Sequence, residues 1–254
     1  MKRIISFSIV KGGSGKTTTA VNLAAYLGMI GKKVLLVDFD PQGNATINFG
    51  IDPDSIIKTV YTALIGKSSV LDSIIPTKYN VDILPANDDL SEFDLMVIQN
   101  ISKIDNPMTL LREAISHLAY DYILVDTPPS KGILTINALT ASTDVIIPMQ
   151  CEYLATKGVN KAIDMINKTK QAYNPNLNLL GIVATMFNNR TNLSSIVLQE
   201  ARKFFLLNNV TVFDTVINRS IKIAESPMSG IPAILYTEYA ESYIELAKEI
   251  FQHE

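Results

Sequence analysis

Near the start of the chain, one loop has the residue types that bind phosphate. It reads Lys11-Gly12-Gly13-Ser14-Gly15-Lys16-Thr17. Glycines let successive backbone N–H groups turn inward around phosphate oxygens, and a helix that follows directly adds its positive N-terminal end. The loop departs from the strict G-x-x-x-x-G-K-[ST] motif, because Val10 and Lys11 stand where that motif begins with glycine. The chemical requirement is still met, and the sequence predicts a phosphate-binding loop.

Two side chains at the end of this loop indicate the ligand. Lys16 can bridge the β- and γ-phosphates of a nucleotide, and the Thr17 hydroxyl can ligate Mg²⁺. We therefore expect ATP and Mg²⁺ as cofactors. A small GTPase would need a guanine-reading Asn-Lys-x-Asp motif, whereas Asn167-Lys168-Thr169-Lys170 lacks the acid and lies inside an expected helix.

Two acidic motifs close apolar, strand-like segments further along the chain. They are Val37-Asp38-Phe39-Asp40-Pro41-Gln42-Gly43-Asn44 and Val125-Asp126-Thr127-Pro128-Pro129. Carboxylates at the carboxyl ends of parallel strands point into the ligand crevice of an open α/β sheet. We expect Asp40 to orient an attacking water, Asp38 to lie nearer the strand and the metal, and Asp126 to hold Mg²⁺ through a water. The predicted metal-binding residues are Thr17, Asp40 and Asp126. An isolated acid can also cap a helix or start a turn, so the joint placement of the two motifs favours the metal site.

The elements that must position these groups alternate between strand-like and helix-like segments. Aliphatic runs predict strands at 4–10, 34–37, 81–84, 122–125, 145–147 and 180–184. Helical spacing predicts helices at 18–29, 107–118, 157–173, 194–207 and 238–251. No repeat, low-complexity tract or long linker divides the chain. The sequence predicts a single domain over residues 1–254, an α/β fold with a doubly wound, mostly parallel sheet and helices on both faces, as in P-loop NTPases.

Lys11 provides a more specific resemblance. A second lysine is unnecessary for cradling phosphate, and in isolation it would be an ordinary solvated charge. The loop nevertheless resembles the deviant Walker A ATPases, whose motif is K-G-G-x-G-K-[ST]. This resemblance implies a homodimer that forms on ATP binding, in which Lys11 reaches the phosphates of the partner subunit. There it neutralises developing charge much as an arginine finger does.

The acidic motifs narrow the resemblance to ParA/Soj-type partition ATPases of the ParA/MinD superfamily. Residues 38–44 and 126–129 resemble the switch I and switch II motifs of that family. Similarity spans nearly the whole chain and includes Gln150-Cys151-Glu152-Tyr153, Arg190-Thr191-Asn192-Leu193-Ser194 and Ala224-Glu225-Ser226-Pro227-Met228-Ser229-Gly230-Ile231-Pro232. The chain departs from the family at Ile9-Val10, where Asn-Gln is frequent, and at Asn218-Arg219, where Pro-Arg is usual.

The same resemblance implies roles for individual residues. The implied catalytic residues are Lys11, Lys16, Asp40 and Asp126. The implied nucleotide contacts come from the loop residues Lys11, Gly12, Gly13, Ser14, Gly15, Lys16 and Thr17, and from Thr18, Asn188 and Asn218. In this family the ATP-bound dimer binds DNA without sequence preference, and a ParB-like centromere-binding partner stimulates an ATPase that is weak alone. The implied function is DNA segregation at the nucleoid.

A basic stretch offers a DNA-binding patch, with Glu200 and Asp214 as the acids within it. It contains Arg190, Arg202, Lys203, Arg219 and Lys222. Phosphate contacts of this kind give salt-sensitive binding. Because a charge cluster is more often a solvated face, the assignment of DNA binding to Arg190, Lys203, Arg219 and Lys222 depends chiefly on the resemblance. The chain begins at its first strand, so we expect no N-terminal helix-turn-helix domain.

Composition restricts the remaining alternatives. The net charge of −3 gives no global attraction to nucleic acid. No apolar run approaches the ~20 residues that a membrane span needs, and we expect a cytoplasmic protein without membrane association. Cys151 is the single cysteine, which excludes an internal disulfide and argues against the cysteine-ligated cluster of a nitrogenase-like iron protein. His117 and His253 each lack a second metal ligand at suitable spacing.

Two functional alternatives stay open at this point. A MinD-like membrane-associated positioning ATPase would need a basic amphipathic C-terminal helix. Residues 238–254 instead carry one lysine, Lys248, against five glutamates, which are Glu238, Glu241, Glu245, Glu249 and Glu254. The other alternative is a scaffold that binds nucleotide without turning it over, which a hydrolysis measurement separates from an ATPase.

Overall fold

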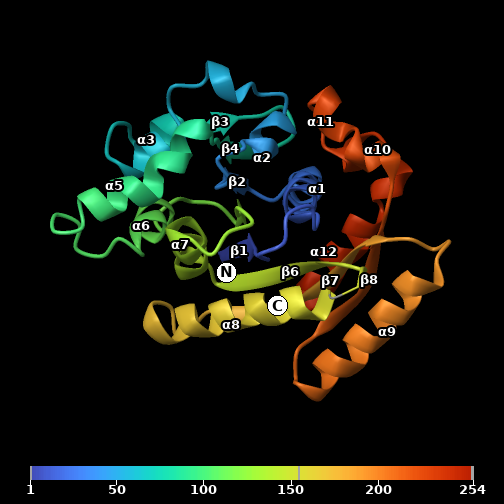
Figure 1. The fold of residues 1–254 in the computed structure, drawn as a ribbon. Helices are drawn as coiled ribbons and strands as arrows, with labels where there is room; N and C mark the ends of the chain where they lie inside the picture. The colour runs from blue at the N-terminus through green and yellow to red at the C-terminus, as the bar shows by residue number, and fades with distance from the viewer. Residues whose placement is uncertain (1, 154, 253–254) are drawn as a thin grey trace.

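A computed structural model describes residues 2–153 and 155–252, and a twisted sheet runs through its centre (Figure 1). Within these residues the sheet has eight strands in the order β3-β4-β2-β5-β1-β6-β7-β8. All neighbouring strands are parallel except β3, which is antiparallel to β4. The strands are β1 (Arg3–Phe7), β2 (Val34–Asp38), β3 (Ile75–Pro76), β4 (Val81–Leu84), β5 (Tyr122–Asp126), β6 (Asp144–Gln150), β7 (Asn178–Phe187) and β8 (Val212–Asn218).

Helices cover both faces of this sheet, which confirms the predicted fold class. They are α1 (Lys16–Met29), α2 (Asn44–Ile47), α3 (Val60–Leu64), α4 (Val70–Ser73), α5 (Phe93–Gln99), α6 (Leu110–Ile115), α7 (Ile133–Ala141), α8 (Ala155–Ala172), α9 (Asn192–Leu207), α10 (Ile221–Ala224), α11 (Ser226–Ser229) and α12 (Ser242–Gln252). Short 3-10 helices are η1 (Pro53–Ser55), η2 (Asp88–Glu92), η3 (Ala233–Leu235) and η4 (Glu238–Ala240).

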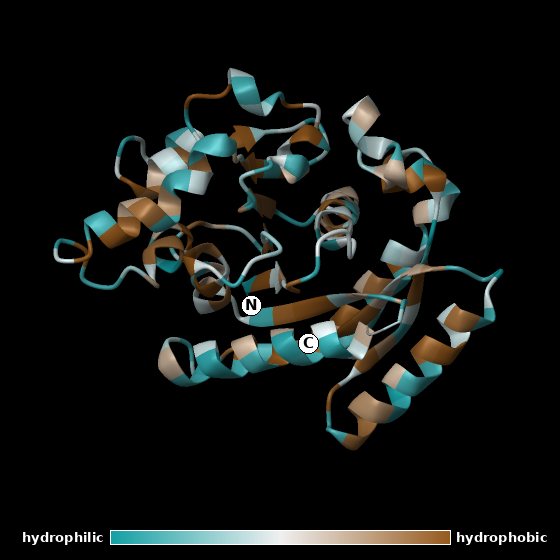
Figure 2. Ribbon diagram, in the orientation of Figure 1, coloured by the Kyte–Doolittle hydropathy of each residue, from teal (hydrophilic) through white to brown (hydrophobic). Residues whose placement is uncertain are grey.

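The buried side chains form a core on each side of the sheet. On one face α1 and α12 pack together and against the strands, with residues such as Leu23, Leu27 and Leu246 buried. On the other face α5, α6 and α7 cover the β2 and β5 side, while α8 and α9 cover β6 and β7. Figure 2 agrees, because the central strands are brown whereas α8 alternates between teal and brown. Continuous apolar runs therefore predicted strands that are buried on both faces.

Several element boundaries differ from the sequence prediction. β1 ends at Phe7 and not at Val10, because the chain leaves the sheet early to form the phosphate loop. α1 starts at Lys16, two residues earlier than predicted, directly after Gly15 with its left-handed φ of 84°. The predicted helix at 107–118 is shorter, since only Leu110–Ile115 is α-helical. The predicted helix at 238–251 divides into η4 and α12.

β8 was not predicted from the sequence, and neither were β3, α7 and the short helices other than α6. Its apolar residues are interrupted by Asp214 and Thr215, so it shows neither a continuous run nor strict alternation. It lies at the edge of the sheet, where one side of a strand has no neighbour and polar residues are tolerated. The prediction of a single domain over residues 1–254, with no domain ahead of it, stays a prediction.

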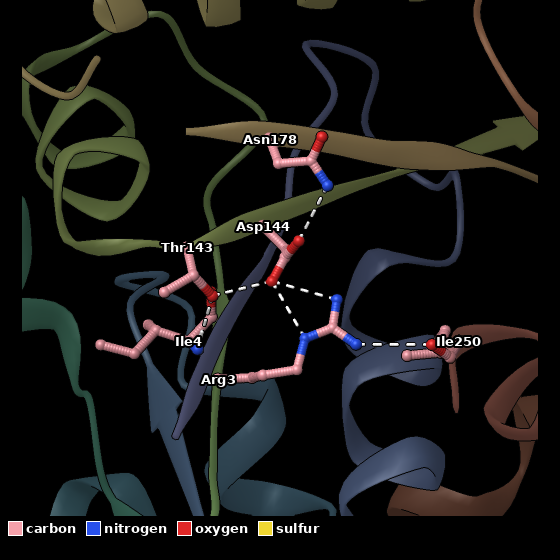
Figure 3. A network of polar contacts seen from close by, with 6 residues as sticks. All are labelled: Arg3, Ile4, Thr143, Asp144, Asn178 and Ile250. Carbon is pink, nitrogen blue, oxygen red and sulfur yellow. Dashed lines mark hydrogen bonds and ion pairs between the residues drawn. The ribbon is translucent and has the colours of Figure 1, made fainter. Parts of the chain in front are cut away.

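The amino ends of β1, β6 and β7 are joined by a network of polar contacts (Figure 3). The Asp144 carboxylate accepts hydrogen bonds from Arg3 Nε at 3.1 Å, Thr143 Oγ1 at 2.8 Å and Asn178 Nδ2 at 3.0 Å. Arg3 also donates to the Ile250 carbonyl of α12 at 3.4 Å. Burial alone would raise the pKa of Asp144, but these hydrogen bonds and the Arg3 charge lower it below its ordinary value. The network fastens α12 to the sheet, far along the strands from the phosphate loop.

The C-terminal helix uses its apolar face inside the protein. Tyr243, Leu246, Ala247 and Ile250 are buried, and the Glu249 carboxylate accepts hydrogen bonds from the backbone N–H groups of β8. The apolar face of α12 is thus occupied, which weakens the MinD-like alternative. No helix in the described ranges is long and apolar enough to cross a membrane. His253 and Glu254, which entered the sequence argument, lie outside the described residues.

Candidate functional site

The carboxyl ends of the three central strands bring the sequence motifs together. β5 lies between β1 and β2, and in the register of these strands Phe7 and Asp38 both stand opposite Asp126. The phosphate loop follows Phe7, and the two acidic motifs begin at Asp38 and Asp126. Three segments that are far apart in sequence therefore meet at one edge of the sheet, where open α/β sheets bind ligands.

The phosphate loop has the backbone that its glycines suggested. Gly13 and Gly15 adopt left-handed φ values of 70° and 84°, which side-chain-bearing residues rarely adopt. α1 begins directly afterwards at Lys16, so its free N–H groups face the loop. The loop is also fixed from outside, because the buried Thr185 hydroxyl of β7 donates to the Ser14 carbonyl at 2.8 Å. Thr185 was not predicted, and its one signal was a hydroxyl near the carboxyl end of an otherwise apolar strand.

A buried lysine and a buried acid influence each other's ionisation at the loop. Lys16 is 6% exposed and Asp126 is fully buried. Burial lowers the pKa of Lys16, and the charges of Asp126 and Asp40 act against this shift. Burial and the charge of Asp38 raise the pKa of Asp126 well above its usual range, while the Thr17 hydroxyl and the Lys16 ammonium act in the opposite direction. Because the charges of these side chains shift one another's pKa values, the lysine and the acids belong to one site.

Asp126 is buried without a well-formed hydrogen bond from the part of the chain that the structure describes. Both of its carboxylate oxygens are buried, and neither accepts a hydrogen bond of normal geometry from the described residues, although Thr17 lies beside them. An unpaired buried carboxylate is costly for a folded protein, so such groups mark ligand or metal sites more often than structural ones. The orphaned oxygens and the neighbouring Thr17 hydroxyl fit a hard cation such as Mg²⁺.

The other two acids are held by the protein itself. Asp38 accepts hydrogen bonds from the Thr46 backbone at 2.8 Å and the Thr46 hydroxyl at 2.7 Å, and burial raises its pKa to about 6. Asp40 accepts from the Gln42 backbone N–H at 3.1 Å. Asp38 thus anchors the segment after β2, and Asp40 follows it into the site. No group of three or more His, Cys, Asp or Glu side chains in residues 2–153 and 155–252 is arranged to hold a metal. Mg²⁺ would therefore need oxygen ligands from a nucleotide and from water, as is usual for this ion.

A cavity of about 290 Å³ opens beside the phosphate loop. Gly15 and Thr18 form one wall, and the ends of β7 and β8 form another. Its remaining lining is largely apolar and comprises Met186, Ile217, Asn218, Arg219, Ser220, Ile221, Ile223, Ala224 and Tyr243, with Thr185 at the loop. Met186 has a positive φ of 51°, a conformation that is costly for a long side chain and concentrates at functional sites. An apolar cavity next to a phosphate cradle has the form expected for a nucleoside pocket.

Of the other residues predicted to contact the nucleotide, one lines this cavity and two lie elsewhere. Asn218 is the last residue of β8 and lines the cavity. Asn188 lies outside the cavity lining, and its side chain accepts from the Arg190 backbone N–H at 3.0 Å. The Lys11 ammonium donates to Gln150 at 2.8 Å and to Glu152 at 2.7 Å, and not to one of the three acids of the site. Cys151, which lies between Gln150 and Glu152 in the sequence, is buried. Burial raises the pKa of its thiol to about 11, so the side chain behaves as a small apolar residue.

The basic residues of the predicted DNA patch are dispersed. Arg190 and Arg219 follow the ends of the neighbouring strands β7 and β8, and both are exposed. Arg219 also lines the cavity, a position that the sequence argument did not foresee. Lys203 lies 11 residues into α9, roughly 16 Å along the helix from its start. Lys222 pairs with Glu225 at 3.9 Å. Arg202 donates to the Asp214 carbonyl at 2.9 Å and so fastens α9 to β8.

Comparison with known proteins gives a consistent result. Residues 2–179 match a family model described as an AAA domain. The chain is 42% identical over 254 residues to the sporulation initiation inhibitor protein Soj of Bacillus subtilis, covering 98% of each chain. It is 41% identical over 258 residues to the chromosome partitioning protein ParA of Myxococcus xanthus, covering 99% of this chain and 89% of that one.

A solved structure extends the comparison to the fold. The cobyrinic acid a,c-diamide synthase of Mycobacterium smegmatis, with bound ATP analog and magnesium, has a TM-score of 0.88 and 33% identity, covering 100% of this chain and 95% of that chain. The phosphate loop, the two acidic motifs and full-length similarity to partitioning proteins all agree. The chain belongs to the ParA/Soj family of chromosome-partitioning P-loop ATPases.

Proposed function

We propose that this chain binds ATP with Mg²⁺ at the phosphate loop and hydrolyses it as the timing step of DNA segregation. The observation that carries this proposal is the buried Asp126 carboxylate, which accepts no hydrogen bond of normal geometry from residues 2–153 and 155–252 and lies beside Lys16 and Thr17. Such a group is costly in the empty protein and becomes favourable when a cation lies next to it. The M. smegmatis structure with bound ATP analog and magnesium supports the choice of ligand.

The residues of the chain divide the chemistry among them. Lys16 and the N–H groups of the loop bind and orient the β- and γ-phosphates. Thr17 and Asp126 would hold Mg²⁺, which supplies positive charge to the phosphates when it is bound. Asp40, tied to the backbone at Gln42, orients the attacking water. The adjacent apolar cavity accepts the nucleoside, with Asn218 able to hydrogen bond to its polar edge.

Assembly and partners complete the proposed cycle. Two protomers close on ATP, and Lys11 of each reaches the phosphates of the other. The dimer binds DNA through Arg190 and Arg219, with Lys203 and Lys222 as additional contacts, and a ParB-like partner accelerates hydrolysis. The positions of Arg190 and Arg219 beside the phosphate-loop edge support coupling between nucleotide state and DNA binding. This scheme places the protein at the nucleoid.

ATP hydrolysis and nucleotide affinity test the core of the proposal. Wild type should bind Mg²⁺-ATP and turn it over slowly, with stimulation by DNA and partner. Asp126→Ala should abolish turnover, whereas the control Asp164→Asn, on the exposed face of α8, should leave it unchanged. Nucleotide binding with no turnover under any condition would instead support the scaffold alternative.

DNA binding is tested separately with unrelated duplexes at several salt concentrations. The variant Arg190→Ala/Arg219→Ala should lose ATP-dependent binding and show a shallower salt dependence, by about two phosphate contacts. Lys103→Ala, a charge loss in the loop after α5, is the control. Undiminished binding by the double variant would exclude these two residues as the DNA contact. Since Arg219 also lines the cavity, ATP affinity has to be measured for the same variant.

A further inference from the structure

Lys11 is held within its own chain by a closed set of polar contacts. Its ammonium donates to Gln150 Oε1 at 2.8 Å and to Glu152 Oε2 at 2.7 Å. Gln150 Nε2 in turn donates to Glu152 Oε1 at 2.6 Å, so the amide orients the carboxylate that receives the lysine. These contacts span about 140 positions in sequence and link the phosphate loop to the end of β6. We call the three residues Lys11, Gln150 and Glu152 the lysine clasp.

The clasp lies on the open side of the phosphate loop. A Cβ atom added at Gly12 or Gly13 would meet no atom within 4 Å, so this part of the loop faces free space. The Lys11 and Glu152 side chains are 44% and 53% exposed. Nothing in the core therefore requires the contact, and solvent or an incoming charged group can replace either partner. A contact with these properties is suited to being broken and re-formed.

The clasp competes with the function proposed for Lys11. An ammonium that is bound to its own Glu152 cannot at the same time reach the phosphates of a second copy. We propose that Glu152, oriented by Gln150, is a positioning residue that restrains Lys11 in the separate protomer and must release it when two protomers close on ATP. This inference rests on the proposed function, since it assumes that Lys11 acts on the partner subunit. It makes the clasp an internal brake on dimer formation.

The size of the effect follows from the exposure of the pair. A surface ion pair shifts an equilibrium by up to roughly fivefold. Two clasps open for each dimer, so their loss should strengthen dimerisation by about 5- to 25-fold. Because exposed charges are screened by salt, the advantage should decrease as ionic strength rises. These expectations concern the dimerisation constant, which a purely structural role of Glu152 would not strengthen.

The direct test is Glu152→Gln, which removes the charge and keeps the size of the side chain. Dimerisation is measured by sedimentation with a non-hydrolysable ATP analogue and Mg²⁺ at low and high salt. The variant should dimerise about 5- to 25-fold more tightly than wild type at low salt and converge with it at high salt. Unchanged or weaker dimerisation would overturn the proposal. Asp164→Asn is the matched control, because it removes one carboxylate from an exposed lysine pair at 3.5 Å on α8.

A second variant separates release of Lys11 from other effects of Glu152. In a Lys11→Ala background, Glu152→Gln should no longer strengthen dimerisation, since there is no lysine to release. A gain that persists in that background would overturn the proposal, and so would an equal gain from Asp164→Asn. If wild type dimerises and Lys11→Ala does not, while Glu152→Gln gives no gain, the clasp inference alone fails. If wild type does not dimerise with nucleotide, the proposed function fails, and the clasp inference fails with it.

Discussion

Asp126 and Asp144 are both buried acids next to the central strand β1, and the protein treats them in opposite ways. Asp144, at the amino ends of the strands, is surrounded by Arg3, Thr143 and Asn178, and its pKa is lowered (Figure 3). Asp126, at the carboxyl ends, accepts no hydrogen bond of normal geometry from the described residues, and its pKa is raised. At the amino ends of the strands, the buried carboxylate is neutralised and hydrogen-bonded by neighbouring side chains. At the carboxyl ends, the buried carboxylate requires a ligand to supply its partner. Stability and function are thus assigned to opposite ends of the same strands.

The strongest test of this comparison is Asp126→Asn. Turnover of ATP should decrease by at least about 100-fold, because the isosteric amide cannot hold the cation or its charge. The free energy of unfolding without ligand should fall by no more than about 1 kcal/mol, because neither oxygen of this carboxylate accepts a hydrogen bond of normal geometry from the described residues. Steady-state hydrolysis and urea unfolding check the two parts. A large loss of ligand-free stability would show that Asp126 is structural, like Asp144.

The converse change is Asp144→Ala. It removes the Asp144 carboxylate, which lies 3.1 Å from the largely buried Arg3 guanidinium. We expect the free energy of unfolding to decrease by about 2–4 kcal/mol, as for other partly buried ion pairs that lose one member. Turnover per folded molecule should change less than about threefold, because the network lies at the opposite end of the strands. Asp214→Asn, which affects an exposed pair with Arg202 at 3.9 Å, is a control with little expected effect.

The two ends should also differ in their pH dependence. Burial raises the pKa of Asp38 from 3.8 to about 6. A raised carboxyl pKa stabilises the folded state at low pH, and this contribution is lost as the pH rises through about 6. Compared with Asp38→Asn, wild type without ligand should therefore become less stable between pH 4 and 7, by about 1–3 kcal/mol.

Asp144 should show the opposite sign. Its lowered pKa contributes stability above the ordinary carboxyl value, and this contribution disappears as the pH falls below about 4. The stability difference between wild type and Asp144→Asn should therefore shrink on acidification, as measured by unfolding at each pH. The same pH trend for both acids would contradict the distinction between the two ends.

The smallest expected effect concerns the contact that fixes the phosphate loop at the carboxyl ends of the strands. Thr185→Val keeps the shape of the side chain but removes the hydrogen bond from β7 to the Ser14 carbonyl. The loss should cost about 1 kcal/mol and weaken nucleotide binding by roughly fivefold. Calorimetric titration with nucleotide measures the affinity. Thr140→Val, at a buried hydroxyl that has no hydrogen-bond partner among the described residues, is a control that should leave affinity unchanged.

Much of the fold was predictable because its signals are local. The strands β2, β4 and β5 are mostly aliphatic, and their predicted bounds agree with the structure to within a residue. β8 was missed because an edge strand needs no continuous apolar run. The register that sets Asp38 opposite Asp126 could not be derived from either segment alone, since it depends on strand order.

The sequence by itself determined the chemistry of the phosphate loop. Glycines at 13 and 15, the lysine and threonine that follow, and a helix start are local properties of one stretch of chain. Only the tertiary structure decided which groups are satisfied and which are left free. The Thr185 contact with Ser14 joins residues 171 positions apart, the lysine clasp joins residues 141 apart, and the partners of Asp144 come from three strand ends. Such contacts are set by the order of strands in the sheet, which no local pattern encodes.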